Sequence, residues 1–183
     1  MTAQGPGTVE REIKLEAGPD LELPDLAGVV PGVTVADDPA LDLDATYVDT
    51  DDLRLVRNGV SLRRRTGEGA PRWTLKLPTV SDGVALARRE IDVEDDGHTV
   101  PPRLAELVTA WVRGAPLGPV VAIRTHRRRL RLLGAEGREL AEVADDDVTV
   151  VEGDEVTQRF REIEVELAEH GDDEIGIAYD IAN

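Results

Sequence analysis

Two segments near opposite ends of the sequence place charged side chains at every second position. In VEREIKLE, Glu10, Glu12 and Lys14 alternate with Val, Arg, Ile and Leu, and in REIEVEL, Glu164 and Glu166 alternate with Ile, Val and Leu. Carboxylate oxygens are ligands that hard divalent cations such as Mg²⁺ and Mn²⁺ prefer, whereas ammonium and guanidinium groups bind phosphate oxygens. Brought together in one site, the two segments would suit a polyanion and a divalent metal.

The basic residues are almost all arginine, so the two lysines stand out. Lys14 and Lys76 are the only lysines among 21 basic residues. Period-two alternation puts Lys76 on the opposite face of its strand from Trp73, and it puts Arg63 and Arg65 together on the preceding strand. A compositional bias toward arginine also explains why lysine is scarce. The two lysines are therefore candidates for anion binding that need further support.

The elements that must position these residues are mostly strands. Alternation and turn sequences predict strands at residues 9–16, 45–49, 60–65, 72–77, 84–93, 120–133, 138–143, 148–152 and 157–167. Helical spacing of apolar residues predicts a helix from Pro102 to Arg113, ended by Gly114. A short helix is expected around residues 21–27, and a helical turn at residues 51–58. The class is α+β, mainly β.

Several of these strands have one charged face and one apolar face. An open sheet explains the pattern if the apolar face packs on a core and the charged face meets water. A closed barrel explains it as well, if the apolar faces point outward beneath helices and loops and the charged faces line the lumen. Charged side chains inside a barrel must be paired or must bind a charged ligand. Alternation alone leaves both folds open.

Length, charge and composition narrow the class of protein. The 183 residues predict a single domain, 1–183, and the lack of cysteine excludes disulfides, thiolate-bound zinc and thiol catalysis. No apolar run approaches the roughly 20 residues of a membrane span, and no leader pattern is visible, so we expect a cytoplasmic protein that does not bind membranes. The net charge of −17 argues against general nucleic-acid binding.

Five motifs, in order, resemble those of CYTH domains in the triphosphate tunnel metalloenzyme family. They are the ExExK pattern at 10–14, YVDTDDLRL at 47–55, GVSLRRRTGEG at 59–69, WTLKLP at 73–78 and REIEVEL at 161–167. A single ExExK pattern is weak, but five ordered motifs that include both lysines are specific. The resemblance covers residues 8–167 and implies a closed eight-stranded antiparallel β-barrel, a triphosphate tunnel, with helices packed outside.

The resemblance also implies roles for individual residues. The expected metal ligands, for Mg²⁺ or Mn²⁺ in a two-metal mechanism, are Glu10, Glu12, Glu164 and Glu166. The expected substrate-binding residues are Lys14, Arg63, Arg65, Lys76 and, in IRTHRRRLRL, Arg127, with Arg124 as the second choice. The expected catalytic residues are Lys14 and one further acid, either Glu142 or Asp145. Glu162 either joins the metal ligands or lies at the strand mouth, His126 is expected to have no catalytic role, and Asp146 and Asp147 are expected in a solvated turn.

The implied function is a metal-dependent triphosphatase that hydrolyses the terminal phosphoanhydride of a small triphosphate. Inorganic tripolyphosphate ranks first as substrate, because the five aromatic residues offer few surfaces on which a base could stack. Thiamine triphosphatase, nucleotide triphosphatase, adenylyl cyclase and a non-catalytic polyphosphate-binding module are the alternatives. Residues 168–183 contain no lysine or arginine, which departs from the family pattern and leaves open a truncation before a C-terminal helix or a CHAD domain.

Overall fold

The computed structural model describes residues 8–18, 20–29, 32–78, 86–95 and 97–168. The strands in this part of the chain are β1 (Thr8–Ala17), β2 (Thr34–Asp49), β3 (Ser61–Thr66), β4 (Arg72–Pro78), β5 (Leu86–Glu94), β6 (Gly118–Leu133), β7 (Glu139–Glu152) and β8 (Glu155–Leu167). The α-helices are α1 (Leu26–Val29) and α2 (Pro102–Val112), and 3₁₀ turns lie at Val56–Asn58 and Ala135–Gly137.

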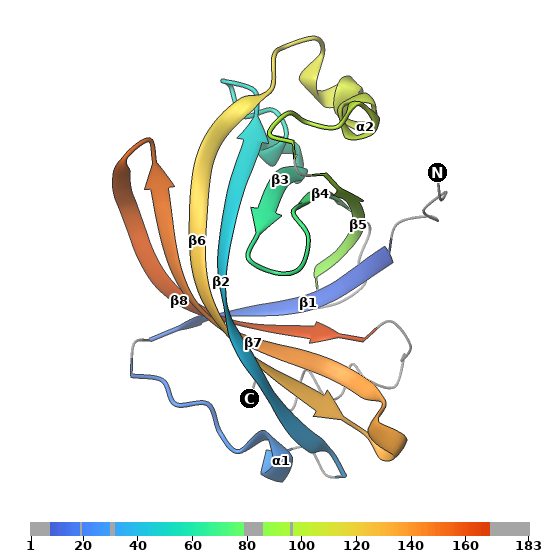
Figure 1. Ribbon diagram of the computed structural model, residues 1–183, viewed down its shortest axis with the longest axis vertical. Helices are drawn as coiled ribbons and strands as arrows, with labels where there is room; N and C mark the ends of the chain where they lie inside the picture. Colours follow the sequence, from blue (N-terminus) through green and yellow to red (C-terminus); the bar gives the residue numbers. More distant parts are fainter. Residues whose placement is uncertain (1–7, 19, 30–31, 79–85, 96, 169–183) are drawn as a thin grey trace.

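The eight strands form one curled antiparallel sheet whose ends meet. Its order is β1-β5-β4-β3-β2-β6-β7-β8, and β8 pairs with β1 to complete the ring. The seam between β1 and β5 is short, since pairing runs only from Thr8 to Glu12 on β1, and β2 and β6 form a much longer ladder. Figure 1 shows this curvature, with α1 and α2 at opposite ends of the molecule. The expected eight-stranded tunnel fold is confirmed, although "closed" slightly overstates an uneven ring.

The apolar faces of the strands point outward and are covered by the helices. Around α2, Leu104 and Val108 pack with Leu62, Trp73 and Leu75 of β3 and β4, all at most 1% exposed. A second cluster joins Leu26 of α1 to the outer faces of β6, β7 and β8 through Leu132, Val143, Ile163 and Val165. The barrel therefore has its hydrophobic clusters outside the ring, which decides against the open sheet with a solvated charged face.

The helix and turn predictions hold with small shifts. α2 begins at Pro102, as expected, and Arg113 takes a left-handed conformation with φ of 51° that ends it. The helical turn expected at residues 51–58 is reduced to a 3₁₀ turn that ends at Gly59, with φ of 70°. The short helix lies at Leu26–Val29 rather than at residues 21–27.

Two strand predictions were wrong in extent. β7 runs without interruption through Asp145–Asp147, although we expected Asp146 and Asp147 in a solvated turn between two strands. β2 starts at Thr34, well before residue 45, and includes an irregularity in pairing between Asp38 and Leu41, where Pro39 lies. Aspartate and proline are rare within strands. Pairing with β6 and β8, and ion pairs described below, override that local preference. No helix among the described residues is long and apolar enough to cross a membrane.

Candidate active site in the barrel lumen

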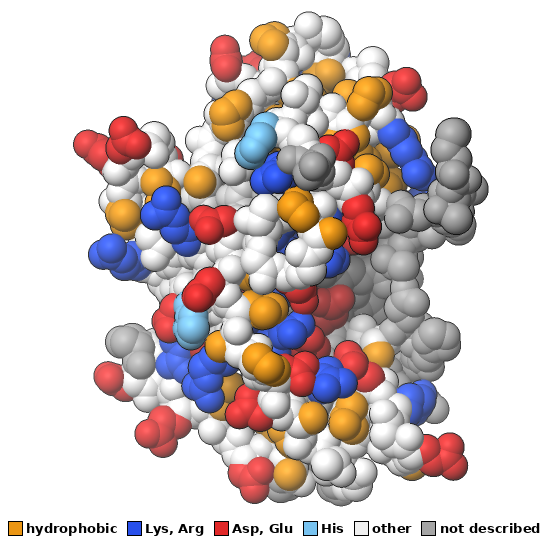
Figure 2. All heavy atoms as spheres, in the orientation of Figure 1, with side chains coloured by type: hydrophobic (Ala, Val, Ile, Leu, Met, Phe, Trp, Pro, Cys, Tyr) orange, Lys and Arg blue, Asp and Glu red, His pale blue; other side chains and the backbone are white. Residues whose placement is uncertain are grey.

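The lumen contains a cavity of about 300 Å³ whose lining is almost entirely charged. Seven basic side chains line it: Lys14, Arg63, Arg65, Arg72, Lys76, Arg127 and Arg129. Of the acidic side chains that the structure describes, seven also line it: Glu12, Glu68, Glu90, Glu139, Glu142, Glu164 and Glu166. Acidic and basic side chains lie together at the centre of the face shown in Figure 2. The lining thus contains many side chains of both signs, although the whole chain carries −17.

The acidic wall of this cavity is formed by β1, β7 and β8. Lys14 lies opposite Glu164 in the register of β1 and β8, and its Nζ donates a hydrogen bond to Oε1 of Glu164. The same Nζ lies 3.8 Å from Oε2 of Glu12 and 3.9 Å from Oε1 of Glu162. Burial lowers the pKa of Lys14, but the neighbouring carboxylates outweigh burial and raise it above 10.5. Lys14 is therefore a stable positive charge within a carboxylate cluster.

Arg127 of β6 connects β7 to β8 across the cavity wall. Its Nε and Nη2 donate to Oδ1 and Oδ2 of Asp146 at 2.8 and 2.6 Å, and Nη2 also donates to Oε2 of Glu164 at 2.7 Å. Burial lowers the pKa of Arg127, but hydrogen bonding to Asp146 and the charge of Glu164 raise it overall. Burial raises the pKa of Glu164, but Lys14 and Arg127 lower it to about 2. Glu164 is therefore ionised at neutral pH.

On the opposite wall, several arginines have hydrogen-bond donors that lack an acceptor among the described residues. Arg63 donates from Nη1 to the hydroxyl of Tyr47 at 3.2 Å, and Lys76 lies 3.1 Å from Oε2 of Glu90. Among the described residues, the Nε atoms of Arg63, Arg65 and Arg129 are buried and have no hydrogen-bond partner. A buried donor without an acceptor costs free energy. Three such donors around one cavity favour an anionic ligand.

The carboxylates can also accommodate a metal ion. One oxygen each from Asp146, Glu162 and Glu164 lies within 4.8 Å of the other two. Glu12 is 4% exposed, and its Oε1 accepts no hydrogen bond from the described residues. Burial raises the pKa of both Asp146 and Glu162. Carboxylates that lie this close together repel one another when ionised, and a hard divalent cation would neutralise that charge.

The structure corrects two of the expected site residues. Arg124 lies on the outer face of β6, where its side chain is 66% exposed and its Nε is 3.4 Å from Oδ1 of Asp44. Asp145 also faces outward, where it accepts two hydrogen bonds from Arg161 at 2.7 and 2.9 Å. Alternation along β6 and β7 therefore brings Arg127 and Asp146 into the lumen and excludes Arg124 and Asp145.

The other expected residues fall into three groups. Glu12, Lys14, Arg63, Arg65, Lys76, Arg127, Glu142, Glu164 and Glu166 all line the cavity. Glu10 pairs in register with Arg88, but its side chain lies outside the described residues, as do residues 169–183. His126 is on the outer face, where its Nδ1 lies 2.8 Å from Oδ1 of Asp42.

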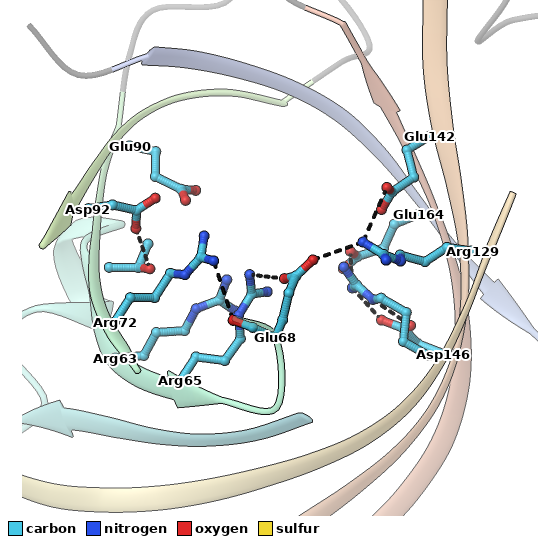
Figure 3. Close-up of polar contacts among 12 residues, drawn as sticks. Arg63, Arg65, Glu68, Arg72, Glu90, Asp92, Arg129, Glu142, Asp146 and Glu164 are labelled. Carbon is cyan, nitrogen blue, oxygen red and sulfur yellow. Dashed lines mark hydrogen bonds and ion pairs between the residues drawn. The ribbon is translucent and has the colours of Figure 1, made fainter. Parts of the chain in front are cut away.

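Sequence reasoning missed several residues of the site. Asp146 was assigned to a solvated turn, yet it is 2% exposed. Arg129 lies two residues after Arg127 on β6, so the two side chains share a face of the strand. Once Arg127 was placed in the lumen, Arg129 could have been placed there as well. Glu68 lies in the turn between β3 and β4, where no periodicity indicates a direction. Only the folded hairpin shows that this side chain enters the lumen (Figure 3).

The YVDTDDLRL motif is structural in this protein. Asp49 is buried, and its Oδ1 accepts hydrogen bonds from the backbone nitrogens of Thr50 at 2.7 Å and Leu55 at 2.8 Å. Its Oδ2 accepts a third from the nitrogen of Val56 at 3.1 Å. Leu55 is 1% exposed beneath α2. The motif therefore shapes the turn that leads into β3, and only Tyr47 contacts a lumen cation.

A larger groove of about 990 Å³ lies on the outer surface beside β6, β7 and β8. Its lining includes Arg128, Asp145 and Arg161. Asp145 and Arg161 already pair with each other, and no side chain that lines this groove has a buried unpartnered polar atom among the described residues. The lumen, with its unpartnered donors, is the better candidate for chemistry despite its smaller volume.

Comparisons with known proteins agree with this architecture. The family model described as CYTH domain matches residues 8–180. Two curated proteins of Mycobacterium tuberculosis, the uncharacterized proteins MT2285 and Rv2226, are each 36% identical over 170 residues, which is 87% of this chain and 33% of theirs. This chain thus spans about a third of the length of those relatives.

A solved structure at a TM-score above 0.5 shows the same fold. A candidate adenylate cyclase of Bacillus halodurans superposes with a TM-score of 0.62 at 16% identity, covering 97% of this chain and 88% of that one. A candidate adenylyl cyclase of Hippeastrum, described as having a dominant triphosphatase activity, matches at a TM-score of 0.46 and 19% identity, covering 87% of this chain and 80% of that one. At these identities the likeness concerns the fold alone.

Proposed function

Because the chain belongs to the CYTH domain family, we propose that it is a metal-dependent triphosphatase acting on a small triphosphate, most simply inorganic tripolyphosphate. In the reaction, water attacks the terminal phosphorus, the bond to the bridging oxygen breaks, and orthophosphate and diphosphate leave. The observation that carries the proposal is the dense set of cations and carboxylates that the described residues place around one cavity.

The mixture of cations and carboxylates in the lumen favours a substrate that arrives with metal. A triphosphate carries about four negative charges, which arginine and lysine side chains can hold. The cations attract the phosphates and the carboxylates attract the metal, and a triphosphate with two bound divalent ions is close to neutral. The lumen thus has a wall rich in carboxylates and a wall rich in cations.

The two walls have separate tasks in this proposal. Arg63, Arg65 and Lys76 hold phosphate oxygens from the cation wall, where unpartnered Nε atoms supply donors. Lys14 and Arg127 lie on the acidic wall and stabilise the negative charge that develops on the transferred phosphoryl group. Lys14 and Arg127 both donate hydrogen bonds to carboxylates in this structure. A phosphate that enters the cavity must therefore compete with these carboxylates for the same donors.

The acidic residues would hold the metal. Asp146, Glu162, Glu164 and Glu12 supply the ligand oxygens, with Glu166 nearer the exposed rim. A bound Mg²⁺ or Mn²⁺ neutralises charge on phosphate oxygens and lowers the pKa of a bound water.

Glu142 is the candidate for the remaining acid, since Asp145 faces outward. Glu142 lines the cavity and lies 3.8 Å from Arg129. Burial raises the pKa of Glu142. A carboxylate with a raised pKa that faces the cavity can accept a proton from water during the attack.

The lining also favours a substrate without a base. No aromatic side chain lines the cavity among the described residues. Trp73 is buried on the outside beneath α2, whereas Phe160 lines the outer groove and also a separate cavity of about 290 Å³ beside Lys14 and Glu162. Recognition of a nucleobase generally uses aromatic stacking, which this cavity does not offer. Tripolyphosphate needs only charged contacts.

A phosphate-release assay with purified protein tests the proposal. Tripolyphosphate, thiamine triphosphate, ATP and long-chain polyphosphate would each be supplied with Mg²⁺, with Mn²⁺ or with EDTA. We expect metal-dependent release that is fastest with tripolyphosphate, and a loss of at least about 100-fold in kcat/KM for Glu12→Gln. The control is Glu152→Gln, which removes one negative charge from the exposed end of β7 and should retain wild-type rates.

Other outcomes would assign a different function. Tight binding of tripolyphosphate without release would indicate a binding module, and formation of cyclic AMP and diphosphate from ATP would indicate a cyclase. Wild-type turnover by Glu12→Gln would refute the assigned ligand set.

A further inference from the structure

The turn between β3 and β4 carries a carboxylate into the cation wall of the lumen. Oε2 of Glu68 accepts a hydrogen bond from Nη2 of Arg65 at 2.9 Å, and Oε1 accepts one from Nη1 of Arg129 at 2.8 Å. Figure 3 shows Glu68 reaching across the lumen from its hairpin between these two arginines. The single carboxylate thus bridges two cations from β3 and β6, strands that are separated in the ring by β2.

This position is one that suits an anionic ligand. The side chains of Arg65 and Arg129 are 15% and 19% exposed, and each retains a buried Nε without a partner among the described residues. Burial lowers the pKa of Arg65, as do the charges of Arg63 and other nearby arginines, while Glu68 opposes this shift. Glu68 therefore satisfies only part of the donor capacity of an electropositive site. A phosphate, with more oxygens and more charge, would satisfy more of it.

The turn that carries Glu68 packs closely against β2, whereas the side chain of Glu68 is part-exposed. Gly67 has φ of 102°, and a Cβ added there would clash with the carbonyl oxygen of Asp42 in β2. Nη2 of Arg72 also donates to the carbonyl oxygen of Glu68 at 3.4 Å. The carboxylate itself is part-exposed, with 30% of the side chain accessible. Release of the two arginines therefore requires rotation of one side chain rather than movement of a lid.

We propose that Glu68 is an internal competitor for the anionic substrate. Its carboxylate holds Arg65 and Arg129 in place until a phosphate group of the substrate displaces it, and this competition sets the affinity for the substrate. The proposal rests on the proposed function, because it assumes that a polyphosphate enters this cavity. It adds a residue outside the acidic wall that controls substrate affinity.

Direct binding measurements test the competition without turnover. Tripolyphosphate would be titrated by calorimetry in EDTA at low salt into wild-type protein, Glu68→Gln and the control Glu152→Gln. Glu68→Gln keeps the size of the side chain and removes its charge, so it should bind tripolyphosphate about tenfold more tightly, a factor equivalent to about 1.4 kcal/mol. Glu152→Gln makes the same change in net charge far from the lumen lining and should bind as the wild type does.

A steady-state measurement separates competition from a structural or metal-binding role. With Mn²⁺ and tripolyphosphate, Glu68→Gln should lower KM by a similar factor and leave kcat within about twofold of the wild type. Unchanged or weaker binding of tripolyphosphate by Glu68→Gln would overturn the proposal, as would a lower kcat with unchanged KM. If the wild type binds but does not hydrolyse tripolyphosphate while Glu68→Gln binds it more tightly, the proposed function fails and the competition stands.

Discussion

Arg127→Gln and Arg124→Gln form a matched pair of substitutions on one strand. The two arginines are three residues apart on β6, so they face opposite sides of the sheet. Each substitution removes one guanidinium and keeps a polar side chain. Arg127→Gln should strongly destabilise the protein, whereas Arg124→Gln should have almost no effect, because only Arg127 is buried among partners.

The expected magnitudes follow from the contacts. Arg127 donates three hydrogen bonds to Asp146 and Glu164, with exposures of 15%, 3% and 14% for the three side chains. Removing one partner from a buried ion pair leaves the other charge uncompensated, which costs about 3–5 kcal/mol. Arg124 and Asp44 are 66% and 69% exposed with a separation of 3.4 Å, and pairs of this kind contribute about 0–1 kcal/mol.

Equilibrium unfolding in urea measures the loss of unfolding free energy that each substitution causes. It would be carried out near neutral pH in EDTA, with the urea dependence of the unfolding free energy compared between variants to check that the cooperativity is unchanged. Adding Mn²⁺ should recover part of the loss in Arg127→Gln, because a metal ion can supply the missing positive charge to Asp146 and Glu164. Equal destabilisation by the two substitutions, or a larger effect of Arg124→Gln, would refute the assignment of Arg127 to the lumen.

Two further predictions concern the acidic wall. The folded pKa of Glu164 is lowered to about 2 from 4.5, so this residue should stabilise the fold by about 3 kcal/mol above pH 4.5 and lose that contribution as the pH falls toward 2. Urea titrations from pH 7 to pH 3 should show a smaller pH dependence in Glu164→Gln than in the wild type, and equal slopes would contradict the assigned pKa. Asp146→Asn should weaken Mn²⁺ binding by about 10- to 100-fold in calorimetry, whereas Asp147→Asn, at an exposed position, should bind as the wild type does. Equal affinities for the Asp146 and Asp147 variants would exclude Asp146 as a ligand.

The success of the sequence predictions depended on whether a residue lay in a clearly alternating strand. Lys14, Lys76 and Glu164 lie in such strands, and all three line the cavity as expected. Alternation is a local property of extended backbone, so it assigns residues to a shared face without any knowledge of the fold. The ordered motifs then added the eight-stranded ring, which the register between β1 and β8 confirms.

The errors arose where local preference and tertiary pairing disagree. Asp145 and Asp146 resemble a turn in sequence, but each carboxylate meets an arginine from a neighbouring strand, Arg161 outside and Arg127 inside. Such partners are distant in sequence, so the ion pairs that make aspartate acceptable in a strand are invisible to local reasoning. The register of the arginines in β6 was ambiguous for the same reason.

The sequence by itself determined which residues share a face, that the chain is mainly β, and that cations and carboxylates gather on the same faces. Only the tertiary structure decided that those faces point into a lumen, because closing the ring puts one face of every strand inside whatever its polarity. It also decided that Asp146 rather than Asp145 enters the lumen, and that Glu68, in a turn with no periodicity, reaches Arg65 and Arg129. Distances across a ring depend on how strongly the sheet curls. The spacing of residues along one strand does not reveal that curvature.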